Sequence, residues 1–146
     1  MSHILYQIIM ANGLALAIDK NNPHQGGILL LQEPNPADPD QQWTYVFDPG
    51  TQASILFNPG RNMFAAPSNL EKGAYVVLYE PTQDFGGGGR TWQITSPNGA
   101  AIRPPANTDL NLNAFGDSWP VGTKVGIWTW DGGQGNETWT TKIVAR

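Results

Sequence analysis

Glu137-Thr138-Trp139, near the end of the chain, has two counterparts upstream, Gln41-Gln42-Trp43 and Arg90-Thr91-Trp92. The tryptophans follow one another at steps of 49 and 47 residues, so the chain of 146 residues divides into three near-equal parts. A fixed period of this length indicates an internal repeat, which has to be found before any single element is assigned. We expect one domain made of three repeats, approximately 1–48, 49–97 and 98–146.

Two further features keep the same order in each third. A glycine stands three residues before an aliphatic residue, and an apolar-x-apolar triplet begins ten residues before that glycine. The glycines are Gly26, Gly73 and Gly122, and the triplets are Leu16-Ala17-Ile18, Met63-Phe64-Ala65 and Leu112-Asn113-Ala114. Counting back 37 residues from the tryptophans gives Tyr6, Ile55 and Ile102, which we interpret as one core position of the repeat.

The composition favours an all-β fold. The chain has 17 glycines and 12 prolines, which indicate many turns and short elements. Short apolar segments between turn signals such as Asp48-Pro49-Gly50 predict four strands in each third, twelve in all. Each four-stranded unit alone would leave unpaired edges, but three hairpins can close a barrel while three others cap its end. The sequence therefore predicts a β-trefoil with pseudo-threefold symmetry.

Charge and residue content exclude several functional classes. With 12 acidic and 8 basic residues and no cluster of cations, the chain would repel a nucleic acid. It has no cysteine, two histidines and no Gly-x-Ser-x-Gly motif, so a thiolate or histidine metal site and a hydrolase triad lack their residues. The carboxylates that a glycosidase would need fall on separate repeats. We expect no enzyme activity, no cofactor and no metal.

The cellular location is predicted from the same absences. No stretch approaches the ~18 apolar residues of a membrane span, so we expect no insertion into a membrane. The first residues, Met1 to Gln7, show neither a basic region nor an apolar region of a signal peptide. Together with the lack of cysteine, this start leads us to expect a cytoplasmic protein or leaderless secretion.

The repeated motifs resemble the Gln-x-Trp repeats of ricin B-type (R-type) β-trefoil lectins over essentially the whole chain. A repeat of that family has an apolar-Asp-apolar triplet, a Gly-x-x-Val strand that ends in an aromatic residue, and a loop to Asn-Gln-x-Trp. The third repeat is most similar, with Leu112-Asn113-Ala114, Gly122 to Trp128, Asp131-Gly132-Gly133 and Asn136-Glu137-Thr138-Trp139. The family's triplet Asp is replaced by Ala17, Phe64 and Asn113, and its Gln is kept at Gln41 but replaced by Arg90 and Glu137.

The resemblance implies that the third repeat carries the best glycan site. Trp128 stands at the position of the aromatic platform that would stack on a sugar ring. Polar side chains that would contact sugar hydroxyls stand at Asn113, Asp131, Asn136 and Glu137. Trp119, in a turn-rich insertion, would line the same site. The alternatives are that Trp128 belongs to the core and that Trp119 packs locally against Phe115 and Pro120.

The other two repeats keep fewer of these features. In the second repeat Tyr79 holds the platform position, with Glu80 next to it and Arg90 within reach, so its site is either degraded or differently specific. In the first repeat Gln32 replaces the ring, and only polar contacts from Asp40 and Gln41 remain. We expect the three motif tryptophans themselves to be structural, with each indole N–H bonded to the backbone.

The sequence thus predicts a non-catalytic lectin that binds neutral glycans or glycoconjugates through shallow sites. Each site should be weak alone, so binding to a cell surface would depend on several sites or on a homo-oligomer. The rival function is that of a β-trefoil protease inhibitor, which would act through a protruding loop at Pro34–Pro39 or Gly86–Gly89. A polysaccharide-targeting module of an enzyme is a third option. Aromatic residues at equivalent positions of two repeats favour the lectin.

Overall fold

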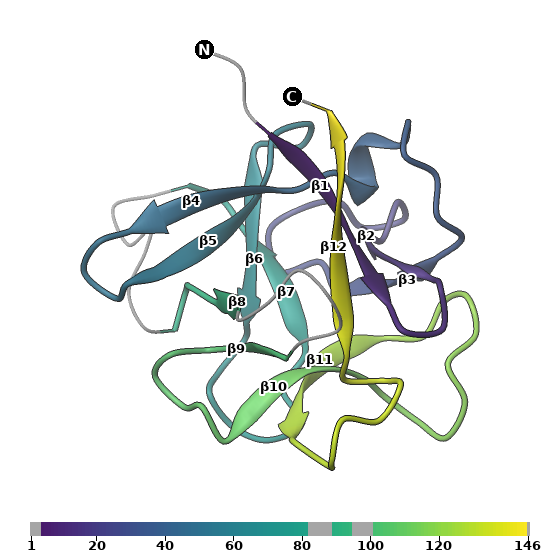
Figure 1. Cartoon of the computed structure of the whole chain (residues 1–146). Helices are drawn as coiled ribbons and strands as arrows, with labels where there is room; N and C mark the ends of the chain where they lie inside the picture. The colour runs from purple at the N-terminus through teal and green to yellow at the C-terminus, as the bar shows by residue number, and fades with distance from the viewer. Residues whose placement is uncertain (1–3, 82–88, 95–100, 146) are drawn as a thin grey trace.

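The computed structural model describes residues 4–81, 89–94 and 101–145, and the prediction of an all-β chain is confirmed in these ranges (Figure 1). Twelve strands are present there, four in each third of the chain. The first third holds β1 (Leu5–Met10), β2 (Ala15–Ile18), β3 (Leu29–Gln32), a 3₁₀ turn (Pro39–Gln41) and β4 (Thr44–Asp48). The second holds β5 (Ala53–Asn58), β6 (Met63–Pro67), β7 (Val76–Tyr79) and β8 (Gln93–Ile94). The third holds β9 (Ile102–Arg103), β10 (Leu110–Ala114), β11 (Val125–Thr129) and β12 (Trp139–Ala145).

Six strands form a barrel in which the last strand of each third pairs with the first strand of the next. These antiparallel pairs are β4–β5, β8–β9 and β12–β1, and the last pair joins the two ends of the chain (Figure 1). Bridges from Tyr6 to Trp43 and from Ser54 to Trp92 link the first and fourth strands within a third. The remaining hairpins, β2–β3, β6–β7 and β10–β11, are the three caps. This is the predicted β-trefoil arrangement.

The repeated glycines explain how the three caps are joined. The N–H of each glycine donates to a carbonyl in the third strand of another repeat, at 2.8 Å in all three cases. The pairs are Gly26 to Leu78, Gly73 to Ile127 and Gly122 to Leu31, which form a closed triangle of backbone bonds. All three glycines have positive φ angles, of 83°, 92° and 92°. Only glycine adopts this conformation without a steric penalty, so the triangle requires glycine at these positions.

The three motif tryptophans are structural, as predicted. Their rings are buried, with no more than 1% of each residue exposed. Each indole N–H donates to a backbone carbonyl 27 residues earlier: Trp43 to Leu16 at 3.2 Å, Trp92 to Ala65 at 2.9 Å and Trp139 to Leu112 at 3.0 Å. All three repeats therefore use the same contact to join the start of the fourth strand to the cap of the same repeat.

These bonds correct the predicted alignment of the second triplet. Because Leu16, Ala65 and Leu112 are equivalent acceptors, the second triplet is Ala65-Ala66-Pro67 and not Met63-Phe64-Ala65. Phe64 is therefore not the residue that replaces the family's Asp, and Ala66 takes its place. The predicted alignment fails because the segment from the triplet to the repeated glycine is two residues shorter in the second repeat than in the other two. A fixed offset counted along the chain cannot detect such a difference.

The predicted core position is confirmed at Ile102 but wrong at Tyr6 and Ile55. The residue two places after each motif tryptophan pairs with the first strand of the next third. Its partners there are Ile8, Leu56 and Ile102, which are therefore the equivalent positions. All three lie in the main core cluster, whereas Ile55 packs in a small second cluster with Phe64. Tyr6 is half-buried on the barrel. The reason is again a difference in length between equivalent segments.

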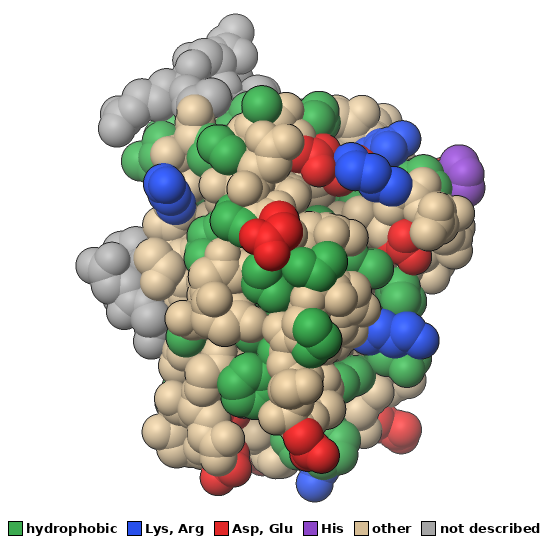
Figure 2. Space-filling model, turned by 90° about the vertical axis from the view of Figure 1, so that its right-hand side faces the viewer, with side chains coloured by type: hydrophobic (Ala, Val, Ile, Leu, Met, Phe, Trp, Pro, Cys, Tyr) green, Lys and Arg blue, Asp and Glu red, His purple; other side chains and the backbone are tan. Residues whose placement is uncertain are grey.

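No helix within the described ranges is long and apolar enough to cross a membrane. Charged side chains on the face seen in Figure 2 are scattered singly or in small groups, and no continuous basic patch is visible there.

Candidate functional site

The β10–β11 hairpin presents Asn113 and Trp128 on its outer face. Residues alternate along each strand, so Leu112 and Ile127 point into the core while Asn113 and Trp128 point outward. Trp128 is 43% exposed, and therefore the alternative that it is a core residue is wrong.

A hollow of about 400 Å³ lies beside this face. The third repeat contributes Asn113, Trp128 and Asn136, together with the segment from Ala114 to Asp117. The second repeat contributes Gly73 and Tyr75. The hollow is therefore a site between two repeats, because the triangle of glycine bonds places the start of β7 against β11.

Aromatic rings form the apolar part of the hollow. The Phe115 ring meets Trp128 edge-on, with 6.4 Å between ring centroids, and Tyr75 lies 5.7 Å from Phe115. The ammonium of Lys72 lies 4.4 Å from the centroid of the Trp128 ring. Such a cation–π contact at an exposed position contributes about 0.5–1 kcal/mol, so a ligand can displace it at small cost.

Two amide side chains form the polar part. Asn136 Nδ2 donates to Asn113 Oδ1 at 2.8 Å and to the Ala114 carbonyl at 3.0 Å, which fixes both amides. Asn113 is 3% exposed, and its Nδ2 has no hydrogen-bond partner among the described residues. A buried donor left in this state is costly, by about 1–3 kcal/mol, unless a water or ligand accepts from it.

Glu137 holds the loop that carries Asn136. Glu137 is 1% exposed. Its carboxylate accepts hydrogen bonds from the backbone N–H groups of Asp131 at 2.9 Å, Gly133 at 2.7 Å and Gln134 at 3.1 Å. Glu137 is not among the residues that line the hollow. It therefore fixes the shape of the loop rather than facing the hollow.

Gln41 has the same role in the first repeat. Its Oε1 accepts the N–H of Asn35, six residues earlier, at 2.8 Å, as Glu137 accepts the N–H of Asp131. Gln41 Nε2 donates to the Glu33 carbonyl at 2.9 Å, and Gln41 is 2% exposed. The first position of the Gln-x-Trp motif thus supports the loop in both repeats.

Two other predicted site residues of the third repeat lie outside the hollow. Asp131 is exposed, and its Oδ2 accepts from the Gln134 amide at 2.8 Å. Trp119 is half-buried against the main core, and its indole N–H donates to the Gly116 carbonyl at 3.1 Å. Both belong to loops that border the hollow, because Gly116 and Asp117 of the Trp119 loop and Asn136 of the Asp131 loop line it.

The platform ring of the second repeat is covered by the protein's own side chains. Phe64 stacks on Tyr79 with 5.4 Å between centroids, and the Arg90 guanidinium lies 4.1 Å from the Tyr79 centroid. The Tyr79 hydroxyl donates to the Pro67 carbonyl at 3.0 Å. Glu80 is exposed, with its N–H bonded to Gln25. Residues 82–88, which include part of the predicted Gly86–Gly89 loop, lie outside the described residues.

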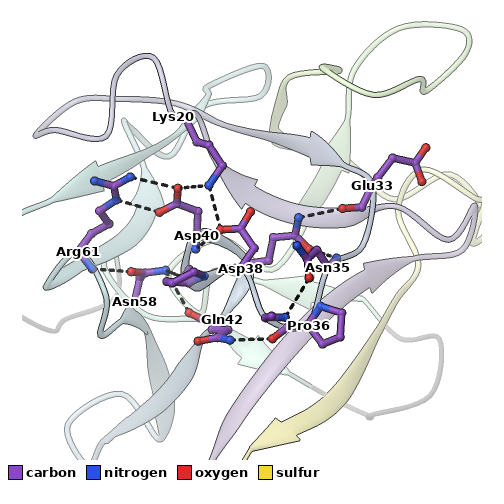
Figure 3. A network of polar contacts seen from close by, with 12 residues as sticks. Lys20, Glu33, Asn35, Pro36, Asp38, Asp40, Gln42, Asn58 and Arg61 are labelled. Carbon is purple, nitrogen blue, oxygen red and sulfur yellow. Dashed lines mark hydrogen bonds and ion pairs between the residues drawn. The ribbon is translucent and has the colours of Figure 1, made fainter.

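In the first repeat, Asp38 and Asp40 form an ion network with Lys20 and with Arg61 of the second repeat (Figure 3). Asp40 is 2% exposed, and its carboxylate accepts from Arg61 Nε at 2.8 Å and Nη2 at 3.1 Å. Lys20 Nζ bridges Asp40 at 2.7 Å and Asp38 at 2.9 Å. Burial alone would raise the pKa of Asp40, but the hydrogen bonds from Arg61 and Lys20 outweigh it and lower the pKa below its ordinary value. The Asp40 carboxylate is thus ionised and bound by Arg61 and Lys20.

Several residues of the third-repeat hollow were not predicted from the sequence. Phe115, Asp117 and Tyr75 line it and belong to no repeated motif, whereas Gly73 is one of the repeated glycines but was not assigned to the site. One signal was available in Gly126, which interrupts an apolar strand. A Cβ at this position would overlap the Phe115 ring and the Ala74 carbonyl, so the glycine marks the close approach of a neighbouring segment.

Within residues 4–81, 89–94 and 101–145, no group of three histidine or acidic side chains is placed to hold an ion.

Comparison with known proteins identifies the fold. No protein-family model and no curated protein sequence matches the chain. Among solved structures, the designed threefold symmetric protein ThreeFoil superposes with a TM-score of 0.80 at 19% identity, covering 94% of this chain and 97% of its own. The Rhizoctonia solani agglutinin gives 0.80 at 13% identity, covering 98% and 96%. The C-half of the earthworm R-type lectin, solved with GalNAc, gives 0.68 at 19% identity, covering 96% and 98%. The chain therefore shares one complete β-trefoil fold with these proteins.

Proposed function

We propose that the chain is a non-catalytic lectin that binds neutral glycans at the third-repeat hollow. The observation that carries this proposal is the arrangement of one half-exposed indole beside two locked amides, of which Asn113 retains an unpartnered donor. The lectin names of two structural neighbours support it.

The arrangement suits the chemistry of a sugar ring. A pyranose has an apolar face of C–H groups, which packs on an aromatic ring such as that of Trp128. Its hydroxyls need both donors and acceptors, and Asn113 Nδ2 and Asn136 Oδ1 offer one of each. Asp117 lines the same hollow, and its carboxylate is a further acceptor for a hydroxyl.

The proposal assigns direct contacts to Trp128, Asn113 and Asn136 and a supporting role to Glu137. It assigns no glycan stacking to Tyr79, because Phe64 and Arg90 lie against that ring. Asp40 and Gln41 are buried, and their side chains are bonded to residues of the first repeat and, for Asp40, also to Arg61 of the second repeat. A single shallow site of this kind is weak, so tight binding to a surface depends on several sites, on one chain or on associated chains.

A glycan array tests the proposal with three proteins. Wild type is expected to bind a defined class of neutral glycans, and Trp128→Ala is expected to lose that binding. Trp130→Ala is the matched control, because Trp130 is 40% exposed on the same segment but does not line the hollow. Retained binding by Trp128→Ala, or no binding by wild type to any glycan, would contradict the proposal.

Of the two loops predicted for the rival inhibitor function, the Pro34–Pro39 loop lies wholly within the described residues. This loop is folded back on itself, since the Asp38 N–H donates to the Asn35 carbonyl at 3.0 Å and Gln42 Nε2 donates to the Pro36 carbonyl at 2.7 Å. A panel of proteases is the corresponding assay. Inhibition that Pro36→Ala abolishes, without glycan binding by wild type, would favour the inhibitor.

A further inference from the structure

The barrel contains a second hollow that shares no residue with the third-repeat hollow. Its volume is about 690 Å³, which lies in the range of pockets that hold small organic ligands. Strands β1, β4, β5, β8 and β12 all contribute to its wall. We name it the barrel hollow.

The wall of the barrel hollow is rich in aromatic faces. Tyr6 and Tyr45 stack in parallel, with 4.5 Å between centroids and 14° between ring planes. Phe47 follows Tyr45 on the same face of β4 and is 59% exposed. Ile143, on β12, is 45% exposed. A ligand that covers these two side chains gains about 25 cal/mol for each Å² of apolar surface removed from water.

The polar groups of the wall are all neutral. The polar side chains, apart from the two tyrosines, are Gln52, Ser54, Gln93 and Thr141, and no lining residue described carries a formal charge. An ionised ligand would leave water without a counter-ion, which is unfavourable. A purely apolar ligand would strip these amides and hydroxyls of water without replacing the lost hydrogen bonds. The lining therefore suits an uncharged molecule with one apolar face and several hydroxyls.

We propose that the barrel hollow is a second saccharide-binding site, in which an uncharged sugar ring stacks on Phe47 and bonds the amides and hydroxyls around it. The site does not depend on the function proposed for the third-repeat hollow, because the two sets of residues are separate. A chain with both sites is bivalent and cross-links glycans as a monomer.

Amide NMR spectra of the full chain distinguish the two sites. The probes are glucose, galactose, N-acetylglucosamine, lactose and cellobiose at millimolar concentrations, with phenol as an aromatic alcohol that is not a sugar. Signals of Ser54 and Gln93 report on the barrel hollow, and signals of Asn113 and the Trp128 indole report on the third repeat. At least one sugar is expected to shift the Ser54 and Gln93 signals in a saturable way, in wild type and in Trp128→Ala alike.

Two variants of β4 provide the matched comparison. Phe47→Ala is expected to weaken saccharide binding at the barrel hollow by about tenfold, because the stacking face is lost. Val46→Ala is the control, since Val46 is 37% exposed on the neighbouring position but does not line the hollow. Both side chains are exposed, so both variants are expected to keep the wild-type fold, which the remaining amide signals verify.

Each outcome has a distinct meaning. If no sugar moves Ser54 or Gln93, the barrel-hollow proposal is wrong, even where Asn113 and Trp128 respond as the lectin proposal requires. It is also wrong if phenol alone binds there, or if Phe47→Ala binds sugars as wild type does. If only the barrel-hollow signals respond, this proposal stands and the function proposed for the third repeat fails.

Discussion

The side chain of Asp40 stands at a position predicted to contact a glycan, but it is bound by other side chains of the protein. It stands at the position equivalent to Asn136, but its carboxylate is bound by Arg61 and Lys20. The difference arises from cations at 20 and 61, which come from separate loops and belong to no repeated motif. The same position therefore supports the fold in the first repeat and the candidate site in the third.

The ion network makes stability depend on pH. Because the folded-state pKa of Asp40 is lower than the ordinary value of 3.8, its contribution is fully present above that value and is lost as the pH falls through the folded-state pKa. Urea unfolding at pH 7 and pH 3 measures the effect. We expect Asp40→Asn to lose less of its free energy of unfolding over this interval than wild type does, and an equal loss would contradict this expectation.

Removing one cation of the network is expected to lower stability at pH 7. Arg61→Gln should reduce the free energy of unfolding by about 1–2 kcal/mol, because hydrogen bonds to a buried carboxylate are lost while Lys20 remains. Because the Arg61 side chain is 39% exposed, the expected loss of stability is smaller than that for a fully buried ion pair. Lys142→Gln, at an exposed position on β12, is the control in the same urea titration and is expected to match wild type.

At the scale of elements, the loop between β11 and β12 depends on one buried carboxylate. Glu137→Ala leaves three N–H groups without their acceptor and is expected to lower the free energy of unfolding by about 2–3 kcal/mol. It should also weaken glycan binding, since Asn136 is carried by this loop. Thermal unfolding and a glycan titration measure the two effects.

Glu137→Gln is the informative partner of that variant. The first repeat already uses Gln41 at this place, so the glutamine is expected to keep most of the stability and binding that alanine loses. If Glu137→Gln loses as much as Glu137→Ala, the charge rather than the acceptor geometry holds the loop.

The glycine triangle joins the three caps through backbone alone. Gly122 has a φ of 92° and open space around its Cβ position, so Gly122→Ala tests backbone strain without a steric clash. We expect it to lower the free energy of unfolding by about 1–2 kcal/mol. Gly122→Asn should cost less, because asparagine tolerates positive φ better, and an unchanged Gly122→Ala would refute the account.

At the scale of the whole molecule, the threefold symmetry has an energetic signature. Trp43→Phe, Trp92→Phe and Trp139→Phe each remove one buried indole bond and leave a small cavity, so each is expected to lower the free energy of unfolding by about 2–3 kcal/mol. Trp128→Phe should change it by less than about 1 kcal/mol, because that ring is 43% exposed. Denaturant unfolding of the four variants compares them directly.

The architecture followed from local signals that every repeat needs for the same physical reason. Trp43, Trp92 and Trp139 each fill the core and bond a cap, and Gly26, Gly73 and Gly122 each adopt a positive φ. The alignment of the second triplet was not predicted correctly. The segment between that triplet and Gly73 is two residues shorter than in the other repeats, so Ala66 stands at the position that Phe64 was predicted to hold.

The candidate site was predicted only in part, because part of it comes from outside its own repeat. Trp128, Asn113 and Asn136 were found from their places in one repeat, whereas Gly73 and Tyr75 reach the hollow across the junction with the second. The stacking of Phe64 on Tyr79 was likewise not predicted, although Arg90 was expected within reach of that ring. Spacing within a repeat carries no information on such contacts.

The most direct test of the proposed lectin function is a crystal structure of the chain with the glycan that it binds best on the array. The account predicts a sugar ring stacked on Trp128, with one hydroxyl accepting from Asn113 Nδ2 and another donating to Asn136 Oδ1. A glycan bound instead at Tyr79 or beside Asp40, with the third-repeat hollow empty, would contradict it.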